Sequence, residues 1–251
     1  MSYAAVASVC GAPPEVSPGG SAAPTLERAS VAVLACVAVS VERRHVRREC
    51  LNPDIVLPYE LRRLDFESAM QDVYDFFYDV NQHLAGKGLG RLEDTVRGAI
   101  LSGVVSDMLT AYLASHSRTL VNNSYHNGHP DLVVAGTYPD DAVKAGEAGV
   151  EVKATTKRGG AVDTHGARDQ WFCVFVYGVD RETQPASARR SLRFTEVYLA
   201  RVSTADFRRN ERGELGTRTA TLHREGIAKL RKSWVYLDTE PELNAGLEVG
   251  S

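Results

Sequence analysis

The sequence predicts an α+β (or α/β) domain in which helices come first, a sheet follows and one more helix closes the chain. From about residue 65 to residue 116, apolar residues recur at spacings of three and four, the period of an amphipathic helix. Beyond Ser117, short β-branched and aromatic runs alternate with Gly, Pro and Asp, as in strands joined by turns. The 251 residues, 43% of them hydrophobic, suffice for one large core.

The composition also suggests where the domain begins. The first thirty residues mix Ala, Ser, Gly, Pro and Val without a sustained period, so residues 1–50 are expected to be a disordered or weakly ordered N-terminal tail. Residues 51–251 are expected to form a single domain. Its helical part would span residues 51–117 and its sheet-containing part residues 118–237.

Within these parts the elements follow in order. One helix is expected from about Asp65 to Gly86, and a second from about Arg91 to His116. The apolar stripe of the second helix would consist of Leu92, Val96, Ile100, Val104, Met108, Leu109 and Leu113. Strands are expected at residues 120–121, 132–135, 150–156, 171–177 and 197–202, followed by a helix at 219–232 and a short strand at 234–237.

Charge and cysteine content exclude several classes of protein. A net charge of -3 argues against a packaging protein with a basic surface, although it allows a local basic face. The four cysteines form no C-x-x-C pair and are too sparse for a disulfide framework, which favours a cytoplasmic location. The apolar segment Ala29–Val41 is too short to span a bilayer as a helix, so no membrane association is expected.

Polar residues interrupt two of the predicted strands. Asp131 precedes the run Leu132-Val133-Val134, and Glu151 and Lys153 alternate with apolar residues in the next strand. Because strand side chains alternate between faces, Glu151 and Lys153 share one face. If the two strands form a hairpin in which opposed positions add up to 282 or 284, Asp131 lies on that face too, whereas an odd sum would separate it from them.

Such a group suits metal-assisted hydrolysis of a phosphodiester. Two neighbouring carboxylates, Asp131 and Glu151, form a hard oxygen site for Mg²⁺, which binds through one or two carboxylates and substrate phosphate oxygens. The ion would lower the pKa of a bound water and offset the charge that develops on phosphorus. Lys153 would add a compact positive charge that positions the water and stabilises the transition state.

The residues Pro130-Asp131 and Glu151-Val152-Lys153 resemble the PD-(D/E)XK motif of the restriction-endonuclease-like nuclease superfamily, with the two acids twenty positions apart. The resemblance implies a mixed central sheet flanked by helices, with the motif on a central hairpin. It also implies that Asp131, Glu151 and Lys153 are catalytic and that Mg²⁺ is held by Asp131, Glu151 and the Val152 carbonyl.

Other residues could support this site. Glu93 resembles the extra acid that many members place beside the metal from a preceding helix, although the helix dipole also favours an acid there. Gln170 leads into the next strand, as polar neighbours of the site do in some related nucleases. His126 and His129 offer nitrogen ligands next to Asp131, but they lack the H-E-x-x-H pattern and are interpreted instead as shaping the turn.

The C-terminal part is basic. Residues 181–232 contain thirteen Lys or Arg and six Asp or Glu. Seven of its arginines are candidates to neutralise DNA phosphates, although each could equally be a solvated surface residue. They are Arg189, Arg190, Arg193, Arg208, Arg209, Arg212 and Arg231. No recognisable motif assigns the residues that read bases.

The expected function is therefore Mg²⁺-dependent hydrolysis of double-stranded DNA by a restriction-type endonuclease. A homodimer is expected, because cutting both strands of a two-fold site requires two active sites. A cognate methyltransferase would belong to the same system. Two alternatives remain open at this point: a repair or recombination nuclease, and a non-catalytic module that binds DNA through a nuclease-like fold.

Overall fold

The structure, a computed structural model, describes residues 41–209 and 219–239. The predicted N-terminal tail lies outside the described residues as far as residue 40. Residues 41–50 lie against the domain and include a short 3-10 turn, η1 (Arg48–Cys50). Val46 N donates to Gln71 Oε1 at 3.1 Å, and Arg47 Nη1 binds Asp238 Oδ1 at 3.2 Å, so this segment contacts both a helix and the residue that follows the last strand.

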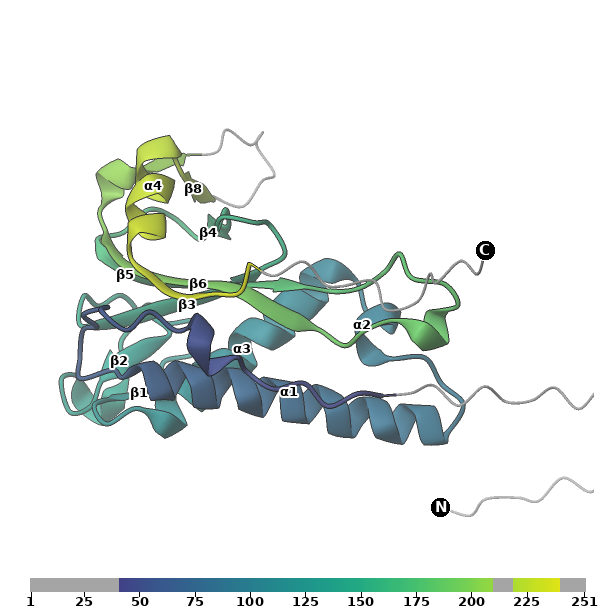
Figure 1. Ribbon diagram of the computed structural model, residues 1–251. Coiled ribbons are helices and arrows are strands. Elements are labelled where there is room, and N and C mark those ends of the chain that lie inside the picture. The colour runs from purple at the N-terminus through teal and green to yellow at the C-terminus, as the bar shows by residue number, and fades with distance from the viewer. Residues whose placement is uncertain (1–40, 210–218, 240–251) are drawn as a thin grey trace, which may run out of the picture. The chain divides into compact units, whose positions relative to one another are not determined.

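The described chain has the predicted α+β order, with helices before the sheet and a helix near its end (Figure 1). The helices are α1 (Arg63–Gly86), α2 (Leu92–Thr95), α3 (Gly98–His116) and α4 (Arg224–Lys232). Three further 3-10 turns are η2 (Pro139–Asp141), η3 (Ala186–Ala188) and η4 (Thr204–Asp206).

A mixed six-stranded sheet forms the centre of the domain, with the strand order β1-β2-β3-β5-β6-β9. β3 and β5 are parallel, and the other neighbours are antiparallel. A second sheet has the order β4-β8-β7. The strands are β1 (Leu120–Asn122), β2 (Leu132–Val134), β3 (Gly149–Thr155), β4 (Asp163–Thr164), β5 (Gln170–Gly178), β6 (Arg193–Val202), β7 (Phe207–Arg209), β8 (Ala220–Leu222) and β9 (Trp234–Leu237).

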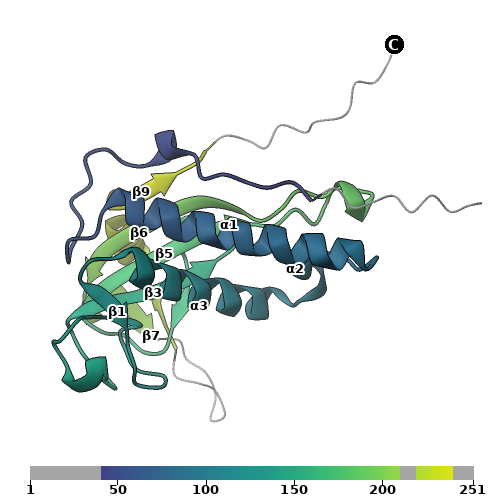
Figure 2. The same cartoon turned by 90° about the horizontal axis from the view of Figure 1, so that it is seen from below.

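The two faces of the central sheet carry separate apolar cores. Helices α1 and α3 run over one face, and α4 with the small sheet covers part of the other (Figures 1 and 2). In β3, Val152 belongs to the core beneath α1 and α3. In β5, Phe175 belongs to this core, whereas Phe172 and Val174 belong to the core beneath α4. The alternation that predicts strands therefore also distributes their side chains between two layers.

The prediction of one continuous helix from Arg91 to His116 is wrong. Val96 and Arg97 are extended, with ψ of 151° and 146°, and they separate α2 from α3. The break shifts the buried stripe, so that Ile100 is 55% exposed. The residues of α3 that are buried are Leu101, Val105, Leu109 and Leu113.

Helix α3 is strongly apolar, and it packs in the core of the domain. By length and composition it is apolar enough to cross a membrane. In this domain it packs against α1, β1 and β3, and its buried residues belong to the core that these elements share.

A second correction concerns residues 219–232, which were expected to form one helix. Ala220–Leu222 instead form strand β8, which pairs with β4 and β7. Helix α4 begins only at Arg224, because the His223 side chain caps it by accepting hydrogen bonds from the amides of Glu225 and Gly226. The short partner strands β4 and β7 were not predicted, since their pairing is entirely long-range.

Candidate active site

The centre of the site is the point where β2 and β3 separate. The two strands pair at Leu132↔Val150 and Val133↔Gly149, positions that add up to 282, so Asp131 comes opposite Glu151. This even register confirms the geometric condition set by the sequence. Pro130, which precedes Asp131, has no amide to donate to β3, and its carbonyl accepts from Asn123 Nδ2 at 2.9 Å. Val152 N of β3 donates instead to the Asp131 carboxylate, at 2.8 Å.

Lys153 lies among oxygen atoms of the same group. Its Nζ is 3.1 Å from Asp131 Oδ2, 2.7 Å from Glu151 Oε1 and 3.0 Å from the Val152 carbonyl oxygen. The Val152 carbonyl also accepts a hydrogen bond from Ser106 Oγ of α3 at 3.0 Å. The three predicted catalytic side chains are thus brought together on one face, and α3 supports them from the other side of β3.

Burial and charge act in different directions on these groups. Burial, with the neighbouring charge of Glu151, raises the pKa of Asp131. Burial also acts to raise the pKa of Glu151, but a hydrogen bond from His129 and the charge of Lys153 outweigh it and hold the pKa at about 2. For Lys153, burial acts to lower the pKa, but the charges of Glu151 and Asp131 raise it. Lys153 is therefore a cation, and Glu151 is ionised, at neutral pH.

His129 belongs to this group, although the sequence interpretation gave it a role in shaping the turn. Its Nδ1 lies 3.1 Å from Glu151 Oε2. One potential ligand atom from each of His129, Asp131 and Glu151 lies within 4.8 Å of the other two. His126 is exposed. The available signal was position: His129 precedes Asp131 by two residues and so projects to the same side if the chain is extended.

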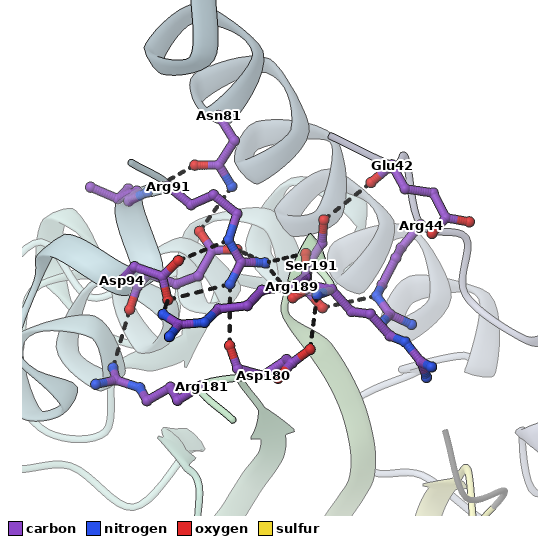
Figure 3. Close-up of polar contacts among 12 residues, drawn as sticks. Glu42, Arg44, Asn81, Arg91, Asp94, Asp180, Arg181, Arg189 and Ser191 are labelled. Carbon is purple, nitrogen blue, oxygen red and sulfur yellow. Dashed lines mark hydrogen bonds and ion pairs between the residues drawn. The ribbon is translucent and has the colours of Figure 1, made fainter. Parts of the chain in front are cut away.

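The structure does not bring Glu93 to the group. Glu93 is fully buried, its Oε2 accepts a hydrogen bond from Asn81 Nδ2 at 2.8 Å, and its Oε1 lies 3.6 Å from Arg91 Nη1. Arg91 in turn binds Asp94 and the carbonyl oxygens of three residues in the β5–β6 connection (Figure 3). We call this set, consisting of Asn81, Arg91, Glu93, Asp94, Asp180 and Arg189, the Arg91 cluster.

Gln170 is placed closer to the predicted site. It begins β5, the parallel neighbour of β3, and because Phe172 pairs with Glu151, Gln170 lies on the same face of the sheet as Glu151. Gln170 is buried, and within the described residues its Nε2 has no hydrogen-bond partner. The same holds for Thr164 Oγ1 and Arg168 Nη1. The segment that leads into β5 thus carries several buried donors.

The arginines of the basic C-terminal part differ in whether they bind other residues of the domain or are exposed to solvent. Arg189 Nη1 binds Asp94 at 3.2 Å and Arg193 Nε binds Asp238 at 3.0 Å, so both contribute to internal ion pairs. Arg231 Nε donates to the Gly159 carbonyl at 3.2 Å. Arg208 is exposed, and Arg212 lies outside the described residues.

A cavity of about 1080 Å³ lies at the end of β5, apart from the candidate catalytic residues. None of Asp131, Glu151, Lys153 and His129 lines it. Its charged lining is mixed, which suits neither a phosphate channel nor a cation site; it consists of Arg158, Asp180, Arg181, Glu182, Arg190, Arg193, Glu196 and Asp238.

The donor set fits a hard cation. The two carboxylates and the Val152 carbonyl already surround one positive charge, the Lys153 ammonium, at hydrogen-bond distances. Oxygen donors of this kind are those that Mg²⁺ takes in proteins. Comparison of the chain with protein families, with curated proteins and with solved structures finds no match.

Proposed function

We propose that this chain is a metal-dependent DNA endonuclease with a restriction-endonuclease-like core, in which Asp131, Glu151 and Lys153 are catalytic. The observation that supports this most is the position of the Lys153 ammonium among Asp131 Oδ2, Glu151 Oε1 and the Val152 carbonyl. An acid pair and a lysine that share oxygen donors at a strand separation are well placed to hold a cation and a phosphate together.

Asp131 and Glu151 would hold Mg²⁺ together with the Val152 carbonyl. When bound, the ion would activate a water and neutralise charge on the phosphate. The ion and the Lys153 ammonium compete for the same oxygens, so Lys153 would turn away from them and direct its charge toward the phosphate. Gln170, with its free amide on the same face, is proposed to orient a substrate or water oxygen.

The proposed activity implies a DNA substrate and a second copy of the chain, and both are part of the proposal. The substrate would be double-stranded DNA, and two copies of the chain would cut the two strands of a symmetric site. Restriction as the biological role would also require a methyltransferase that protects the same sequence. A repair or recombination nuclease would use the same group of residues on damaged or branched DNA.

The test is cleavage of unmethylated and methylated plasmid DNA in the presence of Mg²⁺. Asp131→Asn should slow cleavage by about 1,000-fold or more, since a metal contributes several kcal/mol to transition-state stabilisation. DNA binding in Ca²⁺ should be retained. His126→Gln is the matched control, because His126 is exposed and outside the group.

Cleavage by Asp131→Asn at the wild-type rate would refute the site. Retained DNA binding with no cleavage of linear, nicked or branched DNA in any divalent ion would instead support the non-catalytic alternative. Discrete fragments that disappear on methylation would favour restriction over repair.

A further inference from the structure

His129 is held firmly at the edge of the catalytic group. Its amide donates to the Lys144 carbonyl at 3.1 Å, and its carbonyl accepts from Gly146 N at 2.7 Å. Asn123 joins the same two segments, because its Nδ2 donates to the carbonyls of Pro130 at 2.9 Å and Val143 at 2.8 Å. The backbone on both sides of the imidazole is thus fixed before any ligand binds.

The close packing of this loop requires a glycine at position 128. A Cβ at Gly128 would lie 2.3 Å from the Val143 carbonyl oxygen and 2.5 Å from Asn123 Nδ2, so the chain before His129 passes too close for a side chain. This packing fixes the backbone at His129, and a metal ligand has to be held in that way, within about 0.5 Å of its place.

The imidazole is directed at the carboxylates. Nδ1 of His129 lies 3.1 Å from Glu151 Oε2, while the other oxygen, Oε1, faces Lys153. Ligand atoms of His129, Asp131 and Glu151 lie within 4.8 Å of one another. Two ligands bound to one ion at about 2.1 Å each can be at most about 4.2 Å apart. Only small shifts would therefore place an ion in contact with all three.

A second observation concerns the charge at this place. Glu151 is fully buried, and its Oε1 is compensated by the Lys153 ammonium, 2.7 Å away, without a hydrogen bond of good geometry. A buried carboxylate is costly without a cation, so any ion that displaces the 20% exposed Lys153 must bind this oxygen in its place. The two donors adjacent to it, His129 and Asp131, are 16% and 26% exposed and so remain reachable from solvent.

We propose that His129 is a third protein ligand of the ion held by Asp131 and Glu151, and that this nitrogen makes the centre select a first-row transition ion such as Mn²⁺ over Mg²⁺. The proposal rests on the metal centre of the proposed function and specifies its metal. Mg²⁺ prefers oxygen ligands and retains its waters, whereas an imidazole nitrogen favours first-row transition ions. Mn²⁺ is a transition ion that also takes the carboxylate and carbonyl oxygens present here, so it suits a centre of mixed ligands. If His129 served only as a hydrogen-bond donor to Glu151, it would confer no such preference.

The experiment measures metal binding by the full-length chain without DNA. Calorimetric titration should show Mn²⁺ bound about 10-fold or more tightly than Mg²⁺. Electron spin echo spectra of the bound Mn²⁺ should contain modulation from a directly coordinated nitrogen. Labelling all histidines with ¹⁵N in the wild-type chain should shift that modulation, which identifies the nitrogen as histidine without any substitution.

Substitutions then assign the residue. His129→Gln should remove the nitrogen modulation and weaken Mn²⁺ binding about 10-fold or more, while Mg²⁺ binding changes less than about 3-fold. His126→Gln should leave both unchanged. His129→Asn provides a second, smaller replacement in case the Gln variant does not fold.

The outcomes separate this proposal from the function on which it rests. Mn²⁺ bound at one site that needs Asp131 but gives no histidine modulation overturns the role of His129, even if the chain cuts DNA. No Mn²⁺ binding, or a modulation that persists in both His129 variants, overturns it as well. Histidine modulation that is lost in His129→Gln supports it, even if no DNA is ever cleaved.

Discussion

Two fully buried glutamates, Glu93 and Glu151, show how similar charges come to serve different ends. Each lies beside a basic residue, and each has one oxygen without a hydrogen bond. Near Glu93 the base is Arg91, whose guanidinium is engaged by Asp94 and by backbone carbonyls (Figure 3). Near Glu151 the base is Lys153, a point charge on a flexible stem.

The two sites differ in how firmly the basic side chain is held by its acceptors. Arg91 is 3% exposed and bridges α2 to the β5–β6 connection through several backbone carbonyls. Its removal would break the contacts between these two segments. Lys153 is 20% exposed and binds only groups that a metal ion would also bind. The Arg91 cluster therefore holds α2 to the β5–β6 connection, whereas the Lys153 group is the one proposed to exchange its ammonium for a metal ion.

The largest effect is expected from breaking the Arg91 cluster. Arg91→Met should lower the free energy of unfolding by about 3–5 kcal/mol, because it leaves the buried Glu93 carboxylate without its counter-charge and several carbonyls without their donor. Urea unfolding followed by circular dichroism measures it. Arg48→Met is the control: Arg48 is 74% exposed in its pair with Glu67, so its removal should cost far less than that of Arg91. Equal losses in the two variants would contradict a structural role for the cluster.

An intermediate effect is expected from Lys153→Met, and it should depend on metal. In EDTA the variant should lose about 1–3 kcal/mol, because Asp131 and Glu151 then repel each other without a cation. Mn²⁺ or Mg²⁺ at about 100 times its dissociation constant should return about 2.7 kcal/mol. Thermal unfolding with and without the ion tests this. As a control, metal should stabilise Arg91→Met no more than it stabilises the wild type. If metal fails to stabilise Lys153→Met, the Lys153 ammonium and the metal ion do not share a site.

The smallest effects, on the order of 1 kcal/mol or less, should differ in sign between two aspartates. Burial raises the pKa of Asp131, so its ionised form costs stability at neutral pH, and Asp131→Asn should be slightly more stable than wild type in EDTA at pH 7. Burial acts likewise on Asp180, but backbone amides of Thr183 and Arg190 outweigh it and hold its pKa at about 2. Asp180→Asn should therefore be less stable at pH 7.

The pH dependence completes this test. The contribution of Asp180 is present above about pH 4 and is lost as the pH falls toward 2, so the deficit of Asp180→Asn should shrink over that range. The advantage of Asp131→Asn should also shrink in acid, because the wild-type carboxyl then becomes protonated. Unfolding curves at pH 3 and pH 7 measure both. The same sign for both variants at pH 7 would contradict the difference between the two sites.

The sequence predicted the common face of Glu151 and Lys153 because that part depends on strand geometry alone, and it stated the register that would bring Asp131 to them. The two-residue period places Glu151 and Lys153 on one face, and the even register adds Asp131. Glu93 could not be placed in this way. Its position depends on the break at Val96 and Arg97 and on the buried Arg91, and neither has a signature in the local pattern.

By itself, then, the sequence determined the order of helices before the sheet, the alternation along β3 and β5, and the common face of Glu151 and Lys153; the register of β2 on β3 then added Asp131. The tertiary structure alone decided that His129 joins this group, that Glu93 belongs to the Arg91 cluster, and that residues 220–222 pair with β4 and β7. The reason is physical: side-chain periodicity follows from backbone geometry within a few residues, whereas contacts between distant segments depend on how the layers pack.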